Sequence, residues 1–382
     1  MFEIEWLLDK TKVASNQRIL MYMSNNISPK VVFHRNAIVY PISDFDLQRR
    51  EFNGGVLTEQ GHHCPLSEQI KAGYKNRLGD SLALPQKKVS GRFLYAGMMQ
   101  NRHFGHFLIE SLSRLWASTE INRLDGIVFI LRSPQAEIAQ FAKKIIELFL
   151  QDMPIYVVKE PSQFEELIIS EQICQARQGI LLKHDVFEPL FSKFRSAFQE
   201  PTNAYPNKVY VSRSKLNGNE GLVLAERIFE TNLEVEGYTV IHPQELSVNE
   251  QLNFYANAEK LIFSDGSAFH LYILVAQQFQ DCFIVWRRKK HNDFDIQLRS
   301  FVGKSTYGKP FLDGYFTPEN EAHNSARHKA KLDYEKLKSQ LVEDGFIHGD
   351  EWEVPAERDF TEEIELLEKR LKKRLVYVEA KS

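Results

Sequence analysis

The chain has 382 residues, more than one hydrophobic core usually supports, so we expect two domains of roughly 150 to 200 residues each. Its 48 basic and 51 acidic side chains leave a formal charge of -3, which gives no global electrostatic reason to bind nucleic acid. The three cysteines, Cys64, Cys174 and Cys282, lie far apart without CxxC spacing and therefore predict free thiols in a reducing compartment.

The amino terminus, MFEIEWLLDK, lacks the basic start and the continuous apolar core of a secretory signal. No apolar stretch approaches the roughly 18 residues needed to span a bilayer. We therefore expect a cytoplasmic protein whose membrane contact, if it has one, is peripheral. A basic run near the C-terminus is the place for such a contact, although its charges also suit the last turn of a helix that begins near Thr361. This run is Lys369, Arg370, Lys372, Lys373 and Arg374.

Strands and helices alternate in the first half of the chain. Apolar runs at residues 30–39, 92–95, 126–131 and 155–158 predict strands, several of them buried on both faces. Between the last two, residues 136–150 carry apolar side chains at helical period. Strand, helix and strand in this order are typical of a parallel sheet covered by helices.

Within this half, the run that starts at His103 places polar side chains beside an apolar pattern. A helix that opens near Gly105 is expected here. On it, His106, Glu110 and Arg114 would follow at i, i+4 and i+8 and line one face, which predicts a cleft. Histidine is the commonest positioned base, and Glu110 could orient its second ring nitrogen or act as the base itself. An ion pair between Glu110 and Arg114, with His106 capping the helix, is the structural alternative.

The same alternation restarts after residues 200–207, a segment rich in turn formers that we take as a linker. Each step of the second half is a βα unit. The predicted strands are residues 208–212, 238–241 and 260–264, and the predicted helices are residues 222–231 and 248–258. From about Glu319 the chain becomes charged and helical, with a thin apolar stripe of Leu332, Leu337 and Leu341.

Two loops of this second sheet predict a phosphate site, because open parallel sheets bind ligands at the carboxyl ends of their strands. Arg213 directly follows the first strand, and its guanidinium can grip a diphosphate in bidentate fashion. The loop Asp265-Gly266-Ser267 leads from a strand into a helix, whose first amides could bind a phosphate. A surface arginine paired with an acid, and a glycine that only makes a tight turn, are the alternatives.

Several short motifs, in this order, resemble those of the family 61 glycosyltransferases, which in bacteria include a capsular-polysaccharide type. The resemblance covers roughly residues 92–287. In its first half it rests on Phe104 to Glu110 and on Arg114 to Trp116. In its second half it rests on Tyr210 to Arg213, Asn219-Glu220, Gly237-Tyr238, Pro243, Leu246, Gln251, Ala258, Gly266 to Ala268 and His270. The chain departs from the bacterial relatives at Asp265, where many carry glutamate, and at Phe269, where they carry leucine.

This resemblance implies an inverting glycosyltransferase with a GT-B-like fold, in which two Rossmann-like α/β domains face a cleft. With the pattern of elements, it predicts an acceptor-side domain at residues 1–200, a nucleotide-sugar-binding domain at 201–320 and a charged helical extension at 321–382. The donor is expected to be UDP-linked, and the acceptor to be a glycan or lipid-linked glycan of a bacterial capsule or lipopolysaccharide, made in the cytoplasm or at the inner membrane. Neither a metal nor another cofactor is expected.

Direct displacement at the anomeric carbon needs a base on the acceptor hydroxyl and positive charge or N–H donors on the leaving diphosphate. The candidates for catalysis are His106, Glu110 and Asp265. The candidates for donor binding are Arg213, Gly266, Ser267 and His270. The candidates on the acceptor side are His103 and Arg114.

Three other hypotheses compete with this one. His103, His106 and Glu110 form HxxHxxxE, which with His62, His63 and Cys64 suggests a metal site, but the spacing is not HExxH. Ser267, His270 and Asp265 suggest a hydrolase triad, but the GxSxG elbow is absent. The third hypothesis is a non-catalytic nucleotide- or carbohydrate-binding member of a polysaccharide-assembly complex, which the departure at Asp265 keeps open.

Overall fold

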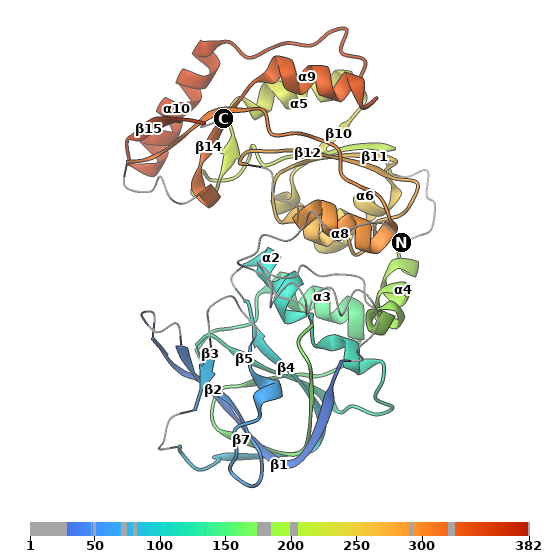
Figure 1. Cartoon of the computed structure of the whole chain (residues 1–382), viewed down its shortest axis with the longest axis vertical. Helices are drawn as coiled ribbons and strands as arrows, with labels where there is room; N and C mark the ends of the chain where they lie inside the picture. The colour runs from blue at the N-terminus through green and yellow to red at the C-terminus, as the bar shows by residue number, and fades with distance from the viewer. Residues whose placement is uncertain are drawn as a thin grey trace, which may run out of the picture. The chain divides into compact units, whose positions relative to one another are not determined.

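The structure of the protein is a computed structural model. It describes residues 29–46, 48, 51–69, 75–78, 82–101, 103–133, 135–173, 185–198, 205–289, 293–319 and 325–380. The chain forms two compact units, Met1–Arg195 and Ser196–Ser382 (Figure 1). Cys174 and most of the predicted linker at residues 200–207 lie outside the described residues, whereas Cys64 and Cys282 are buried free thiols as predicted.

The first unit is built on one seven-stranded sheet. Its strands are β1 (Val31–Asp46), β2 (Glu51–Leu57), β3 (Lys75–Arg77), β4 (Lys87–Met99), β5 (Gly126–Leu131), β6 (Ile155–Val158) and β7 (Ser162–Ser170). They lie in the order β3-β2-β1-β7-β4-β5-β6. The sheet is mixed, because β1 pairs antiparallel with β2 and β7 whereas β7, β4, β5 and β6 run parallel. Every residue of β5 is buried, as its unbroken apolar run predicts.

The helices of the first unit are short. They are η3 (Pro65–Ser67), α2 (Phe104–His106), the π-helical turn η4 (Phe107–Ser111), η5 (Leu115–Ser118), α3 (Gln140–Leu150), η6 (Asp185–Phe187) and α4 (Glu188–Ser196). α3 confirms the helix predicted between β5 and β6, but it begins at Gln140 rather than at residue 136. The ring of Phe141 on α3 contacts those of Phe104 and Phe107, with centroids 5.2 and 5.5 Å apart, so α3 holds the turn that carries His106.

The second unit contains a parallel four-stranded sheet with the order β10-β8-β11-β12. Its strands are β8 (Lys208–Val211), β10 (Thr239–Ile241), β11 (Lys260–Ser264) and β12 (Asp281–Val285), and its helical segments are α5 (Glu226–Val235), η7 (Pro243–Glu245), α6 (Val248–Asn257), α7 (Ala268–Tyr272) and α8 (Asp293–Val302). α5 lies on one face of the sheet, and α6 and α8 lie on the other (Figure 1). This doubly wound arrangement is Rossmann-like, as predicted. The chain leaves β8 toward β10 on one side and returns to β11 on the other, so the switch point lies between β8 and β11.

A second sheet of this unit has the order β15-β13-β14-β9. Its strands are β9 (Leu222–Val223), β13 (Leu312–Pro318), β14 (Lys329–Leu332) and β15 (Leu375–Glu379), and η8 (Ser325–Arg327), α9 (Tyr334–Glu343) and α10 (Glu357–Leu371) accompany it. The tail is therefore not only helical, since Leu332 ends a strand rather than lying on a helix. Leu337 and Leu341 of α9 share a buried cluster with Tyr210 and Phe229, which means that the tail completes the core of this unit.

The helix predicted at residues 222–231 is displaced along the chain. Leu222 and Val223 are extended and pair with β14, and the helix begins at Glu226. The amide of Leu224 donates to the carbonyl of Ala330 at 2.8 Å. A strand partner about a hundred residues further along the chain thus overrides the local helical pattern.

Candidate functional site

His106 and Glu110 form a pair within one turn of the first unit. His106 Nδ1 lies 3.1 Å from Glu110 Oε1. The histidine side chain is 40% exposed, whereas the side chain of Glu110 is fully buried. Glu110 Oε2 has no hydrogen-bond partner among the residues described. The buried carboxylate therefore orients an exposed imidazole, which is the arrangement expected of a positioned base.

Arg114 does not share a helix face with His106 and Glu110, so the prediction that these three side chains line one face is wrong. The π-helical turn η4 widens the helix by one residue per turn, and the helix ends before Arg114 is reached. The Arg114 side chain is buried, and its guanidinium donates to three carbonyls: those of Leu66 at 2.8 Å, Glu68 at 2.6 Å and Ser170. The alternative ion pair between Glu110 and Arg114 is wrong as well.

Burial lowers the pKa of Arg114 to about 10, which still leaves the side chain protonated at neutral pH. Gly97 makes room for it, because a Cβ at Gly97 would lie 3.1 Å from Arg114 Nε and the backbone there has a φ of +81°. Three carbonyls from two separate segments, η3 with its C-cap and the end of β7, thus use this guanidinium as their common donor. This geometry favours a structural role over contact with an acceptor.

His103 lies beside the pair. It is exposed at the N-terminus of α2, and its ring meets that of His106 edge to face, with centroids 5.7 Å apart. His63, by contrast, contacts Glu68, and Cys64 Sγ lies 3.6 Å from His34 Nε2. In the described part of the chain no group of three or more histidine, cysteine, aspartate or glutamate side chains could hold a metal ion.

In the second unit, the loops after β8 and β11 open on the same edge of the sheet, as predicted. The two strands are parallel neighbours, with Val211 opposite Phe263. Arg213 donates from Nε and Nη2 to the carbonyl of Gly221, at 3.2 and 2.8 Å. A Cβ at Gly266 would lie 2.5 Å from Arg213 Nη1, so this glycine lets the arginine approach the β11 loop. Burial lowers the pKa of Arg213.

Asp265, at the end of β11, is completely buried and bound by arginine. Arg288 donates from Nε to Oδ2 at 2.7 Å and from Nη2 to Oδ1 at 3.0 Å, which is a bidentate pair. Arg287 Nε donates to the backbone carbonyl of Asp265 at 3.0 Å. Burial, the largest cause, lowers the pKa of Arg287 to about 10. Arg287 and Arg288 therefore hold Asp265, and Arg213 lies beside the next residue, Gly266, at this edge of the sheet.

The hydrolase hypothesis is wrong for this geometry. Asp265 binds Arg288, and His270 Nδ1 lies 2.8 Å from the side-chain oxygen of the buried residue Gln297 on α8. The phosphate site predicted at the amides of Gly266 and Ser267 stays a prediction. α7 has only five residues, and the amides of Phe269 and His270 already donate to the carbonyls of Gly266 and Ser267. Positive charge at this edge therefore comes mainly from the arginines.

Sequence reasoning missed Arg287, Arg288 and Glu226. The two arginines directly follow the apolar strand DCFIV and its tryptophan, which is the signal that could have found them. Glu226 is buried at the start of α5 and accepts hydrogen bonds from the hydroxyl of Tyr210 at 2.6 Å and the amide of Arg213 at 3.0 Å. No local sequence pattern predicts this role of Glu226, because the residues that it binds, in β8 and in the loop after it, precede it by more than ten positions.

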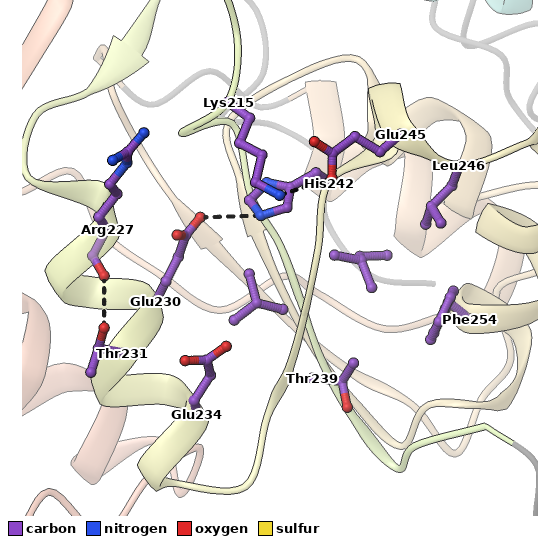
Figure 2. A pocket seen from close by; sticks show the side chains of 12 residues that line it. Lys215, Arg227, Glu230, Thr231, Glu234, Thr239, His242, Glu245, Leu246 and Phe254 are labelled. Carbon is purple, nitrogen blue, oxygen red and sulfur yellow. Dashed lines mark hydrogen bonds and ion pairs between the residues drawn. The ribbon is translucent and has the colours of Figure 1, made fainter.

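A pocket of about 630 Å³ opens beside β10, and Lys215 of the loop after β8 lines it (Figure 2). Two acidic side chains of its wall have polar partners: Glu245 binds Lys215 at 2.9 Å, and Glu230 accepts a hydrogen bond from Ser214 at 2.6 Å. His242 Nε2 lies 3.9 Å from Glu230. The pocket is lined by Lys215, Arg227, Glu230, Thr231, Glu234, Thr239, Val240, Ile241, His242, Glu245, Leu246 and Phe254. Basic and acidic side chains are mixed on this wall. The positively charged cluster of this unit is instead formed by the arginines that follow β8 and β12.

No curated protein matches the chain. Residues 104–280 match the model of the family described as Glycosyltransferase 61. This stretch includes His106 and Glu110 of the first unit and Arg213 and Asp265 of the second, whereas Arg287 and Arg288 lie beyond it. The match indicates that the protein is a glycosyltransferase, similar over these residues to family 61.

Proposed function

We propose that the protein is an inverting, GT-B-type glycosyltransferase that moves a sugar from a nucleotide-sugar donor to a glycan or lipid-linked glycan. The observation that carries the proposal is the arginine cluster at the switch point between β8 and β11. Doubly wound sheets bind nucleotides at such a point, and guanidinium groups suit diphosphates. The family match supports the transfer itself.

In the proposed reaction, His106 takes the proton of the acceptor hydroxyl. The acceptor oxygen then attacks the anomeric carbon, the bond from this carbon to the diphosphate oxygen breaks, and the configuration at the carbon inverts. Glu110 orients His106 and stabilises the imidazolium that forms. His106 is the better base of the two, because its ring is exposed whereas the carboxylate of Glu110 is buried.

Arg213, with the loop of Gly266, Ser267 and His270, stabilises the negative charge that develops on the leaving diphosphate. The charge of the arginines supplies what a divalent metal supplies in other transferases, so transfer is expected to persist in EDTA. The finer biological setting that we propose is the synthesis of bacterial capsule or lipopolysaccharide from a UDP-linked donor, in the cytoplasm at the inner membrane. The basic last turn of α10, with Lys369 and Arg370, supports a contact with an anionic lipid surface.

The test compares the wild type with Arg213→Ala in a thermal-shift screen against UDP, GDP, CDP, ADP and their common sugar conjugates. A ligand that binds only the native state raises its apparent stability. We expect one nucleotide to stabilise the wild type and to lose this effect in the variant, and its sugar conjugate to be transferred or slowly hydrolysed. A nucleotide that binds without transfer or hydrolysis would instead favour a non-catalytic assembly protein, and unchanged affinity in Arg213→Ala would remove this arginine from the donor site.

A further inference from the structure

The arginines that bind Asp265 indicate its role better than the fact that it is a carboxylate. We propose that Asp265 is a positioning residue that holds Arg288 in place, and that Arg288 is a contact for the donor diphosphate. The inference rests on the proposed function, since it names a further residue of the nucleotide-sugar site. It also removes Asp265 from the candidates for the catalytic base.

Two observations argue against Asp265 as a base. A base must bring an oxygen within hydrogen-bond reach of the acceptor hydroxyl, yet Asp265 is 0% exposed. Both of its carboxylate oxygens already accept hydrogen bonds from Arg288, at 2.7 and 3.0 Å. A substrate hydroxyl would have to displace a bidentate guanidinium to reach either oxygen. His106 meets no such obstacle, because its side chain is 40% exposed.

The placement of Arg288 suits an anion. β11 and β12 are parallel and in register, with Ser264 opposite Val285, so the residues that follow both strands meet at one edge. The Arg288 side chain is 29% exposed, whereas that of Arg287 is only 6% exposed. Arg288 is therefore the guanidinium from the β12 loop that an incoming ligand can reach. The bidentate pair with Asp265 fixes its plane, and a fixed plane costs less entropy when a phosphate binds.

The charge balance of the cluster points the same way. Arg213, Arg287 and Arg288 lie near the buried carboxylates of Asp265 and Glu226, and Glu220 and Asp293 add negative charge near Arg213 and Arg288. The charges of Arg213 and Arg288 both lower the pKa of Arg287, which burial lowers most. Like charges this close repel one another, and a bound diphosphate relieves that repulsion. Asp265 thus relieves part of the same repulsion and keeps the guanidinium of Arg288 in place.

The experiment measures the dissociation constants of UDP, GDP, CDP, ADP and inorganic pyrophosphate by calorimetry, with kcat, KM and the pH profile of kcat for transfer. The variants are Arg288→Ala, Arg288→Lys, Asp265→Asn and Asp265→Glu. Arg299→Ala is the matched control, because Arg299 is also an arginine of the second unit paired with an aspartate, Asp295, at 2.8 Å. It lies on α8 and is 55% exposed.

We expect Arg288→Ala to weaken binding of the nucleotide and of pyrophosphate by about 10- to 100-fold, the usual worth of a hydrogen bond to a charged group. Arg288→Lys should recover part of this loss, because it keeps the charge but not the fork. Asp265→Asn should raise the KM for the donor by about 10-fold and leave the pH profile of kcat unchanged, and Asp265→Glu should restore most of the affinity. Arg299→Ala should behave as the wild type.

Different failures are distinguishable. If the wild type binds none of these probes and transfers no sugar, the proposed function and this inference both fail. If the wild type binds a nucleotide but Arg288→Ala binds it equally well, only the inference fails. If Asp265→Asn keeps full donor affinity but loses kcat together with the acidic limb of the pH profile, Asp265 is the base. Should the Asp265 variants not fold, the Arg288 variants decide the matter by themselves.

Discussion

The two candidate sites differ in how far apart along the chain their residues lie. His106 and Glu110 lie four positions apart in the sequence and meet within one helical turn. Arg213, Asp265 and Arg288 follow three different strands and meet only because β8, β11 and β12 are neighbours in one sheet. The first site is therefore a property of a short segment, whereas the second is a property of strand order. Local spacing along the sequence can therefore reveal a pair of residues but not a cluster drawn from several strands.

The largest expected effect tests the local pair. His106→Ala should lower transfer by about 10²- to 10⁴-fold, because general base catalysis contributes that much. Glu110→Gln should lower it less, since the imidazole stays but loses its orienting charge. Nucleotide affinity should not change in either variant. Steady-state transfer and calorimetry check this, with His103→Ala as the neighbouring comparison, and near-wild-type turnover in His106→Ala would remove the pair from the mechanism.

The second prediction concerns stability and tests whether Arg114 has a structural role rather than a role beside His106 and Glu110. Arg114→Met should destabilise the protein by about 3 kcal/mol or more, because the carbonyls of Leu66, Glu68 and Ser170 lose their common donor at ~1 kcal/mol each or more. Chemical denaturation measures the change. The folded fraction should keep its KM for the acceptor. Unchanged stability together with a raised acceptor KM would return Arg114 to the acceptor site.

A smaller effect tests whether the cluster depends on close approach between loops. Gly266→Ala places a methyl group 2.5 Å from Arg213 Nη1, so the guanidinium must move. Nucleotide affinity should fall by about 10-fold. The double variant with Arg213→Ala should bind no more weakly than Arg213→Ala alone, because both changes act through the same side chain. Additive losses of binding energy would show that Gly266 acts independently of Arg213.

The smallest effect concerns the pocket wall beside β10. Burial lowers the pKa of His242, although Glu230 partly opposes this. The unfolded chain then takes up a proton near pH 6.5 while the folded chain does not, so stability falls as the pH drops through that value. His242→Asn should weaken this dependence between pH 7.5 and 5.5 in thermal denaturation. The exposed His348→Asn is the control, and equal pH dependence in both variants would contradict the prediction.

Some site residues could be predicted because their signal is local. Arg213 and Asp265 each come directly after an apolar run, and the end of a parallel strand is a known place for ligands. Arg288 carries the same signal, but the run DCFIV was not among the predicted strands. Glu226 carries none, because its importance comes from contacts with Tyr210 and Arg213 across the sheet edge. Its position at the start of a helix would be ordinary for any glutamate.

The βα alternation of residues 208–264 and the closeness of His106 to Glu110 follow from the sequence alone, because both rest on periodicities of a few residues. Which strands are neighbours, and therefore which side chains meet, depends on the tertiary fold. It put Arg288 on Asp265, turned Leu222 and Val223 into a strand, and buried Arg114 under three carbonyls. In each case the deciding partner lies far along the chain, and backbone and charged groups that leave water must find such partners wherever the fold provides them.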